Sequence, residues 1–460
     1  MSSIEKLRWC FFEAPRKFSA EAMELHCCRK GKSFERSITL KKQWGGLLIY
    51  VLMVVVSLTV AGQQQAFAQA PAGGAPAQTP AAAAPSTPQP LPNPSMTAPL
   101  STAAPSHTFN AGPLGTVAIT GILSGIGLVQ SNYTLGFDKP TEWDVSNAQI
   151  FLQKTSGWFQ FYLQAGAYSL PDLGVPYIRS VEALSSGLPT AVGDFYGPFP
   201  QGYVKLVKGN FFAEVGALPT LIGGEYTFSF ENMNVERGIL WNQENAVNRG
   251  VEVGDTFKKL TLAFTWNDGF YSNVYNWLWG SAAYAFNSSN TLSFVAGGNV
   301  AHTAPTNNPF VTPTALNNES IYNVIYTYSH ESLMITPYFQ YTHVGANPAI
   351  GIGGSGSTTG GAVLLNYNFK HGISLAARPE YITSSSGLPV TDPAALNLIY
   401  GPGSSAFAFT ATPAYQKGGF FLRGDVSVVH ARNFTPGFAF GLGGLKANQT
   451  RGVVEAGFMF

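Results

Sequence analysis

The sequence predicts an all-β fold, a transmembrane, antiparallel, up-and-down β-barrel of about 16 strands, and three observations lead to this prediction. Only 11% of the 460 residues are charged, while 13% are aromatic and 50 are glycine. The last eleven residues, Thr450 to Phe460, alternate between side chains suited to lipid and side chains suited to water. The predicted strands are joined by connections that are alternately very short and long.

The N-terminal region has the layout of a secretory signal. Lys41 and Lys42 precede a 14-residue apolar run, Leu47 to Val60, and a small-residue site follows at Ala66-Phe67-Ala68. The run is too short to cross a bilayer as a helix, which needs about 20 apolar residues. We therefore expect residues 1–68 to be a signal peptide with an N-terminal extension, cleaved after Ala68; a stop-transfer anchor is the alternative.

Cleavage would change the composition of the chain. All three cysteines, Cys10, Cys27 and Cys28, would be removed, so the mature chain could form no disulfide. Residues 1–68 hold ten of the 26 Lys and Arg but five of the 25 Asp and Glu, which leaves a net charge of about −4. A nucleic-acid partner requires a basic face and is therefore not expected.

Residues 69–110 are rich in Ala, Pro and Gln, and they are predicted to form a disordered periplasmic spacer. A segment that binds the cell wall is the alternative. Residues 111–460 are predicted to form the barrel. Its expected strands are 115–129, 144–154, 157–168, 199–208, 210–217, 248–256, 258–267, 275–286, 291–302, 319–329, 332–343, 359–369, 372–383, 404–416, 419–431 and 450–460.

The side-chain period of two assigns faces to most of these strands. In 157–168, for example, Phe159 and Phe161 should face lipid while Gln160 and Tyr162 face the interior. An Arg or Lys on the lipid face at mid-bilayer costs about 2–4 kcal/mol, so charged strand residues should point inward. Strand 275–286 has no clear alternation, and its Trp277 and Trp279 are expected in an interfacial aromatic girdle.

A barrel of 16 strands is wide enough to hold water, and the inward charges would line it. The expected pore-lining residues are Lys205, Glu214, Glu252, Arg378, Glu380, Arg423, Asp425, Arg451 and Glu455. The alternative for each of them is a purely structural place in a salt-bridged wall.

The third long connection, Leu218 to Val247, holds four acids and one base among aromatic residues. We expect it to fold inward as a pore constriction that favours cations, with Glu225, Glu231, Glu236 and Arg237 at the narrowest point. The alternative is an outward fold over the surface.

Enzyme and metal motifs are incomplete. Gly351, Gly353 and Gly356 match G-x-G-x-x-G without a helix after them, and His330-Glu331 begins HESLM, which lacks the second histidine of a zinc site. We therefore expect no catalytic residues, no metal and no cofactor. A hydrolase built into the barrel wall is left open.

The stretch Gly216 to Gly254, with GGEYTFSFENMNVERGILWNQENAVNRGVEVG at positions 223–254, resembles the OmpL-like β-barrel porins. The matching positions are Gly216, Glu225, Arg237-Gly238 and Gly250-Val251. The C-terminal aromatics Phe458 and Phe460 are similar to the closing-strand signal that bacterial barrels present to their assembly machinery.

The resemblance implies a channel in the bacterial outer membrane. Its expected function is passive diffusion of small hydrophilic solutes or ions, with membrane lipid and the assembly machinery as partners and a homo-oligomer left open. The alternatives are a channel specific for a sugar or organic acid, and a plugged barrel that serves as a surface scaffold or enzyme.

Overall fold

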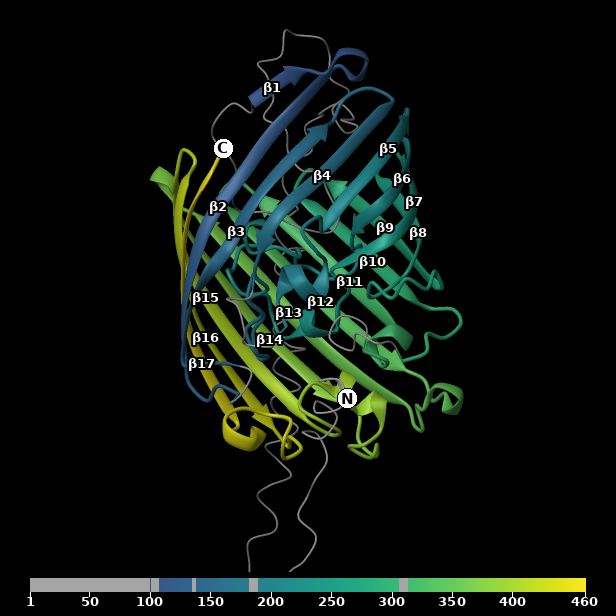
Figure 1. The fold of residues 1–460 in the computed structure, drawn as a ribbon, viewed down its shortest axis with the longest axis vertical. Helices are drawn as coiled ribbons and strands as arrows, with labels where there is room; N and C mark the ends of the chain where they lie inside the picture. Colours follow the sequence, from purple (N-terminus) through teal and green to yellow (C-terminus); the bar gives the residue numbers. More distant parts are fainter. Residues whose placement is uncertain (1–99, 101–106, 135–137, 182–188, 306–312) are drawn as a thin grey trace, which may run out of the picture. The chain divides into compact units, whose positions relative to one another are not determined.

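Sixteen antiparallel strands form one closed barrel (Figure 1). The computed structural model describes residues 100, 107–134, 138–181, 189–305 and 313–460. Each barrel strand pairs with the next, and β17 pairs with β2, which closes the sheet without a free edge. The strands are β2 (Thr116–Gln130), β3 (Thr141–Lys154), β4 (Phe159–Tyr168), β5 (Gln201–Lys208), β6 (Phe211–Pro219), β7 (Val247–Phe257), β8 (Leu260–Asn267), β9 (Trp277–Asn287), β10 (Asn290–Asn299), β11 (Glu319–His330), β12 (Leu333–Val344), β13 (Gly356–Asn368), β14 (Ile373–Ser384), β15 (Ser405–Lys417), β16 (Phe420–Arg432) and β17 (Asn448–Met459).

Helical structure among the described residues is confined to segments of three to six residues. These are η2 (Gly112–Leu114), η3 (Ala191–Phe195), η4 (Ser229–Glu231), η5 (Leu240–Gln243), η6 (Leu316–Asn318), η7 (Pro348–Ile350), η8 (Lys370–Gly372), η9 (Pro393–Leu398) and η10 (Leu442–Gly444). A helix long and apolar enough to cross a membrane is not found in this part of the chain.

The predicted alternation of connections is confirmed. Seven connections of two to four residues lie at one end of the barrel, and the eight longer loops lie at the other. The ends of the observed strands differ from the predicted ends by no more than three residues. The predicted signal peptide, and most of the predicted spacer, lie outside the described residues.

The two ends of the described chain meet at the seam between β2 and β17. The backbone N–H and carbonyl of Phe460 bond to the carbonyl and N–H of Gly121, at 3.0 and 2.9 Å. A short strand, β1 (His107–Asn110), then pairs with the first residues of β2, beyond the end of β17 (Figure 1). These four residues were assigned to the spacer by the sequence analysis, and they extend the sheet at the end that has the short turns.

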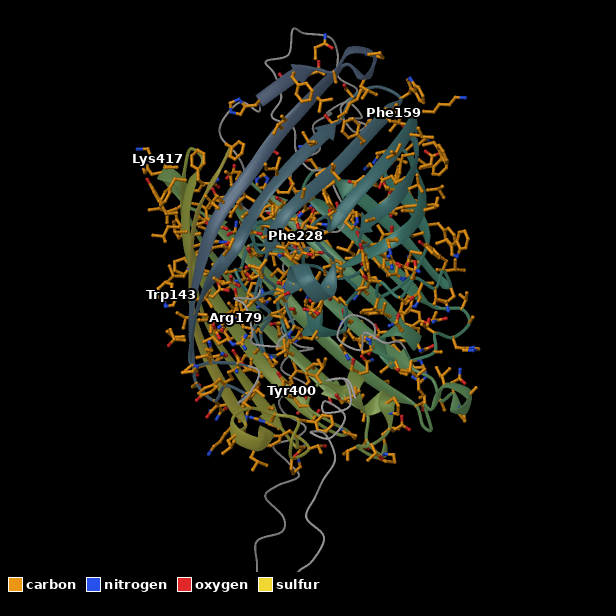
Figure 2. All side chains as sticks on the ribbon, viewed as in Figure 1. Trp143, Phe159, Arg179, Phe228, Tyr400 and Lys417 are labelled. Carbon is orange, nitrogen blue, oxygen red and sulfur yellow. The ribbon has the colours of Figure 1, made fainter. Side chains whose placement is uncertain are left out.

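The predicted faces are confirmed on the strands with clear alternation. In β4, the side chains of Gln160, Tyr162 and Gln164 are buried inside the barrel, while Phe159 and Phe161 lie on its outer face. Figure 2 shows Phe159 and Lys417 near the end with the short turns, and Tyr400 near the opposite end.

The expectation for the two tryptophans of β9 is wrong. Trp277 and Trp279 are 0% and 1% exposed, so they point into the barrel and do not belong to a lipid-facing girdle. The Trp277 indole N–H donates to the backbone carbonyl of Asn317 at 3.1 Å, and its ring packs edge-on against Phe270. Because the interior holds an apolar cluster on this side, large aromatic side chains are stable there.

Candidate functional site

The loop between β6 and β7, residues 220–246 and here called loop 3, lies inside the barrel. Figure 2 shows its Phe228 in the interior, between the two ends. The loop forms two single-turn helices, η4 and η5, whose backbone bonds satisfy part of its polar groups. Glu231 closes the first turn by accepting a hydrogen bond from the N–H of Phe228 at 3.2 Å. The expectation that this segment folds inward therefore agrees with the structure.

Apolar side chains hold loop 3 against the barrel wall. The ring of Phe230 packs on Phe151 of β3 at 5.6 Å between centroids, and Phe228 packs edge-on against Tyr168 of β4 at 5.0 Å. On the other side, loop residues join one buried cluster with the inner faces of β12 to β14. The loop members of that cluster are Leu221, Ile222, Met233, Ile239 and Leu240. Burial of these side chains favours the inward position of the loop.

Arg378 of β14 fixes the middle of loop 3. Its guanidinium bonds to the Glu225 carboxylate at 2.6 Å and to the backbone carbonyl of Glu236 at 2.7 Å. The same guanidinium bonds to Glu380, its neighbour along the inner face of β14, at 3.0 Å. Arg378 is fully buried, so it is stable there only because both carboxylates compensate its charge.

Arg423 of β16 and Glu455 of β17 form a second anchor. Their side chains pair at 2.7 Å, and Arg423 also donates to the loop carbonyl of Asn232 at 2.7 Å. Glu455 accepts a hydrogen bond from the hydroxyl of Ser229 in the loop at 3.0 Å. This pair therefore links adjacent strands of the wall to the first turn of loop 3.

Asp425 of β16 binds the loop backbone directly. Its carboxylate accepts hydrogen bonds from the N–H groups of Val235 and Glu236, at 3.1 and 2.7 Å, and from the Thr412 hydroxyl at 2.6 Å. No cation is bonded to it within the described chain. Asp425 thus acts as an acceptor for two backbone donors that would otherwise be buried without partners.

A second loop takes part that the sequence analysis did not single out. Residues 169–200, here called loop 2 (182–188 are not described), join β4 to β5 and approach loop 3 at Arg237. The Arg237 guanidinium pairs with Asp172 at 2.5 Å, and the backbone groups of Arg237 bond to those of Pro171 and Leu173 at 3.0 and 2.9 Å. The two loops are therefore joined through both backbone and charge.

Arg451 of β17 contacts both loops. It pairs with Glu236 of loop 3 at 3.0 Å and donates to the carbonyl of Asp172 in loop 2 at 2.7 Å. Its Nε donates to Gln130 of β2 at 2.8 Å, which also ties it across the seam. Arg451 is the residue that connects the closing strand, loop 2 and loop 3.

The remaining predicted lining residues lie on the opposite wall. Lys205 of β5 pairs with Glu214 of β6 at 2.7 Å and lies over the Phe212 ring. Glu252 of β7 stands directly across from Glu214 and accepts a hydrogen bond from Thr265 at 3.1 Å. These residues do not contact the acids of loop 3 through any bond among the described residues.

The structure changes how the loop acids are understood. The sequence analysis treated Glu225, Glu231 and Glu236 as one negative group, but Glu225 and Glu236 are each paired with an arginine of the wall. Only Glu231 has no arginine within ion-pair distance among the described residues, and burial raises its pKa to about 8. The loop acids are anchors of the loop more than free charges.

The C-terminal aromatics lie on the outer face of the seam. Phe458 is 51% exposed there, and the Phe460 ring covers Gly121, where an added Cβ would lie 2.4 Å from the ring. Gly121 therefore provides the space that the terminal ring occupies. Recognition of these residues by an assembly machinery stays a prediction.

Comparison with known proteins agrees with this architecture. Residues 116–460 match the family model described as "Putative beta-barrel porin-2, OmpL-like". A search of curated protein sequences gave no match.

Solved structures of outer-membrane channels are similar in fold. The channel DcaP of Acinetobacter baumannii is 9% identical, with 75% of this chain and 97% of that chain covered and a TM-score of 0.50. OmpT of Vibrio cholerae is 10% identical, with 77% and 100% covered and a TM-score of 0.49. An anion-selective porin from Comamonas acidovorans is 12% identical, with 75% and 99% covered and a TM-score of 0.48. At these identities DcaP supports the fold alone. Because the family model covers the whole barrel, the chain belongs to the OmpL-like β-barrel porins of the bacterial outer membrane.

Proposed function

We propose that loop 3 is the constriction of a channel through which small hydrophilic solutes and ions diffuse passively across the outer membrane. The observation that supports this most is the set of three wall arginines, Arg378, Arg423 and Arg451, each bonded to loop 3 inside a closed 16-strand barrel. Glu225, Glu236 and Arg237 then serve to position the constriction, and Glu231 adds negative charge to it only above its pKa of about 8. Loop 2 narrows the same passage from the end with the long loops.

The channel should prefer cations. Among the described residues, 13 carboxylates are buried against four arginines, and three half-buried bases, Arg179, Lys205 and Arg249, pair with three of these carboxylates. The excess negative charge favours cations in the lumen, and its effect should weaken at high salt because the Debye length is about 10 Å at 0.1 M. The acids paired with arginine contribute little to this preference, so it depends on carboxylates without an arginine partner once they are ionised, such as Glu252 and, above about pH 8, Glu231.

Membrane lipid surrounds the barrel, whose outer face carries exposed apolar side chains on every side. The assembly machinery, acting on Phe458 and Phe460, and a homo-oligomer are further proposed partners. We include no catalytic activity in the proposal, because the buried charges that contact loop 3, namely Arg378, Arg423, Arg451 and their carboxylate partners, are engaged in anchoring it.

A plugged barrel is the second candidate, and the apolar contacts of loop 3 with the wall favour it. Planar-bilayer recording of the purified protein separates the two. Stepwise conductance is expected for the channel, whereas a correctly folded barrel that never conducts would support the plug.

A further inference from the structure

The wall formed by β5, β6, β7 and β8, here called the short wall, contains the three shortest strands of the barrel (Figure 1). β5 and β8 have eight residues each and β6 has nine, whereas β11 to β17 have 12 or 13. A tilted strand needs about 9–11 residues to cross the hydrocarbon core of a bilayer. The short wall therefore matches the bilayer less well than the rest of the barrel, and oligomerisation is one way in which a short apolar span is accommodated.

The short wall also carries outward charge within a strand. Val251 and Phe257 of β7 are exposed while Glu252 is buried, so the odd-numbered residues of this strand face outward. Arg249 and Asp255 are among them. In the other barrel strands, as far as the structure describes them, no Asp or Glu faces outward, and the outward Lys and Arg are last residues of a strand: Lys154, Lys208, Lys417 and Arg432. Because a charge that faces lipid is destabilising, β7 is better suited to a protein contact than to lipid.

Asp255 has a base on the same wall that is too far away to pair with it. Lys208, the exposed last residue of β5, stands opposite Phe211 of β6. Phe212 of β6 stands opposite Gly254 of β7, which puts Asp255 beside Phe211 on its other side. Neighbouring strands are about 4.8 Å apart, so two strand spacings, about 10 Å, separate Lys208 from Asp255. Neither residue forms an ion pair within the described part of the chain.

This row of side chains is complementary to itself. A two-fold axis along the membrane normal at Phe211 places Lys208 of one copy opposite Asp255 of the other copy, and the reverse. Two identical ion pairs then form across one contact, as in an isologous interface. A ring of three or more copies needs two different faces, whereas this one face carries both charges.

A shallow groove on the same wall gives the contact a shape to fill. It lies toward the end with the long loops and has a volume of about 540 Å³, and its lining includes Val215, Ala217, Val251, Trp266 and Tyr275. Arg249 borders the groove, and Asp268 compensates its charge at 2.8 Å. Because the lining is apolar and the bordering cation already has a partner, the groove fits apolar side chains of a second copy better than an anionic headgroup.

We propose that the short wall is the contact surface between two copies of this chain, related by a two-fold axis that passes near Phe211. Lys208 and Asp255 of each copy form two reciprocal ion pairs across the axis, and the groove packs against the partner. The inference deepens the homo-oligomer proposed above, and it rests on the proposed outer-membrane barrel but not on conduction.

Charge exchange tests the ion pairs. Light scattering measures the protein mass of the purified barrel in detergent, and circular dichroism checks each variant for β-structure. We expect twice the chain mass for wild type and a single chain mass for Lys208→Asp and for Asp255→Lys, since each exchange brings like charges together. Lys208→Asp/Asp255→Lys restores opposite signs and should restore the dimer. Lys417→Asp, the same exchange at the corresponding end of β15, should remain dimeric.

Cysteine cross-linking tests the position of the axis. Cysteine occurs only at positions 10, 27 and 28, so a chain with these three replaced by serine can carry one introduced thiol. Phe211→Cys should give a disulfide-linked dimer under mild oxidation, because the two copies of this residue meet at the axis. Phe420→Cys should not, although Phe420 lies at the same end of the barrel on β16 and is 47% exposed against 45% for Phe211.

A monomeric wild type would overturn the proposal. A dimer that survives both single exchanges, or equal cross-linking of the two cysteine variants, would overturn it as well. Planar-bilayer recording separates this result from the channel function. A monomer that conducts contradicts the contact alone, whereas a dimer that never conducts contradicts the channel alone.

Discussion

Arg451 of the closing strand bonds to Glu236 of loop 3 at 3.0 Å and, at the same time, to the backbone of loop 2. Both side chains of the pair are fully buried. One residue of the wall therefore bonds to two successive long loops, both of which lie more than 200 residues from it in sequence. Closing the barrel at the β17–β2 seam brings this residue to the loops, so seam formation and loop docking are linked.

Arg451→Gln should loosen both loops. Breaking a buried ion pair by removing one partner costs about 3–5 kcal/mol, since it leaves the other charge without compensation. We expect a lower urea midpoint of unfolding and a noisier, larger single-channel current. Arg432→Gln, at the exposed end of β16, is the matched control and should change neither. If the single-channel current of Arg451→Gln is as quiet and as small as that of the wild type, the ion pair between Arg451 and Glu236 does not hold the loops.

The ion pair itself should contribute little to selectivity. Glu236→Gln/Arg451→Gln removes one negative and one positive charge, so the net charge of the lumen stays the same. We expect its reversal potential under a KCl gradient to remain close to that of the wild type, although the loop is less stable. Glu252→Gln removes a carboxylate without an arginine partner and should reduce the cation preference. A larger loss of cation preference in Glu236→Gln/Arg451→Gln than in Glu252→Gln would mean that the loop acids act as free charges.

The current should depend on pH through Glu231. Burial raises the pKa of this carboxyl from 4.5 to about 8, against smaller opposing effects of the Phe228 N–H and Arg237. A carboxyl with a raised pKa stabilises the docked loop at low pH, and this contribution is lost as the pH rises from about 4.5 to about 8. We expect loop-related noise to increase between pH 5 and pH 8 in wild type and to change little above that. Glu231→Gln, which mimics the protonated form, should remove this increase; an unchanged pH response in the variant would contradict the assignment.

Gly121 should be required for stable closure of the barrel. A Cβ at Gly121 would lie 2.4 Å from the Phe460 ring, whereas a Cβ at Gly125, on the same face of β2, meets nothing closer than 3.7 Å. Gly121→Ala should therefore displace the terminal ring and lower stability by about 1–3 kcal/mol, the usual effect of overpacking. The urea midpoint of refolded barrel measures this. Equal midpoints for Gly121→Ala and the control Gly125→Ala would show that the ring position is unimportant.

Strand positions and most faces could be predicted from the sequence, since a lipid-facing strand imposes a period of two and the costs of misplaced charge are large. The direction of the β9 tryptophans could not be predicted, because both faces of that strand are largely apolar. The side chains of Trp277, Trp279 and Ala283 point inward, while those of Leu278 and Tyr284 do not. The direction of such a strand depends on the apolar cluster that fills the interior, which is a tertiary feature.

The residues of the candidate site were found more readily than their partners. Charges that must point inward identified Arg378, Arg423 and Arg451, and the unusual composition of loop 3 identified its acids. Which carboxylate pairs with which arginine depends on the path of the loop through the lumen, and so it could not be read from spacing. Asp172 of loop 2 was missed because its segment carries little charge.

The most direct test of the constriction is the single-channel conductance of wild type and of a variant in which residues 225–243 are replaced by a short Gly-Ser linker. Both proteins are refolded, checked for β-structure by circular dichroism, and recorded in planar bilayers under the same salt. If loop 3 is the constriction, the wild type conducts in steps and the variant conducts in steps several-fold larger. Equal conductance in the two proteins, or a wild type that stays silent while the variant conducts, would contradict the account.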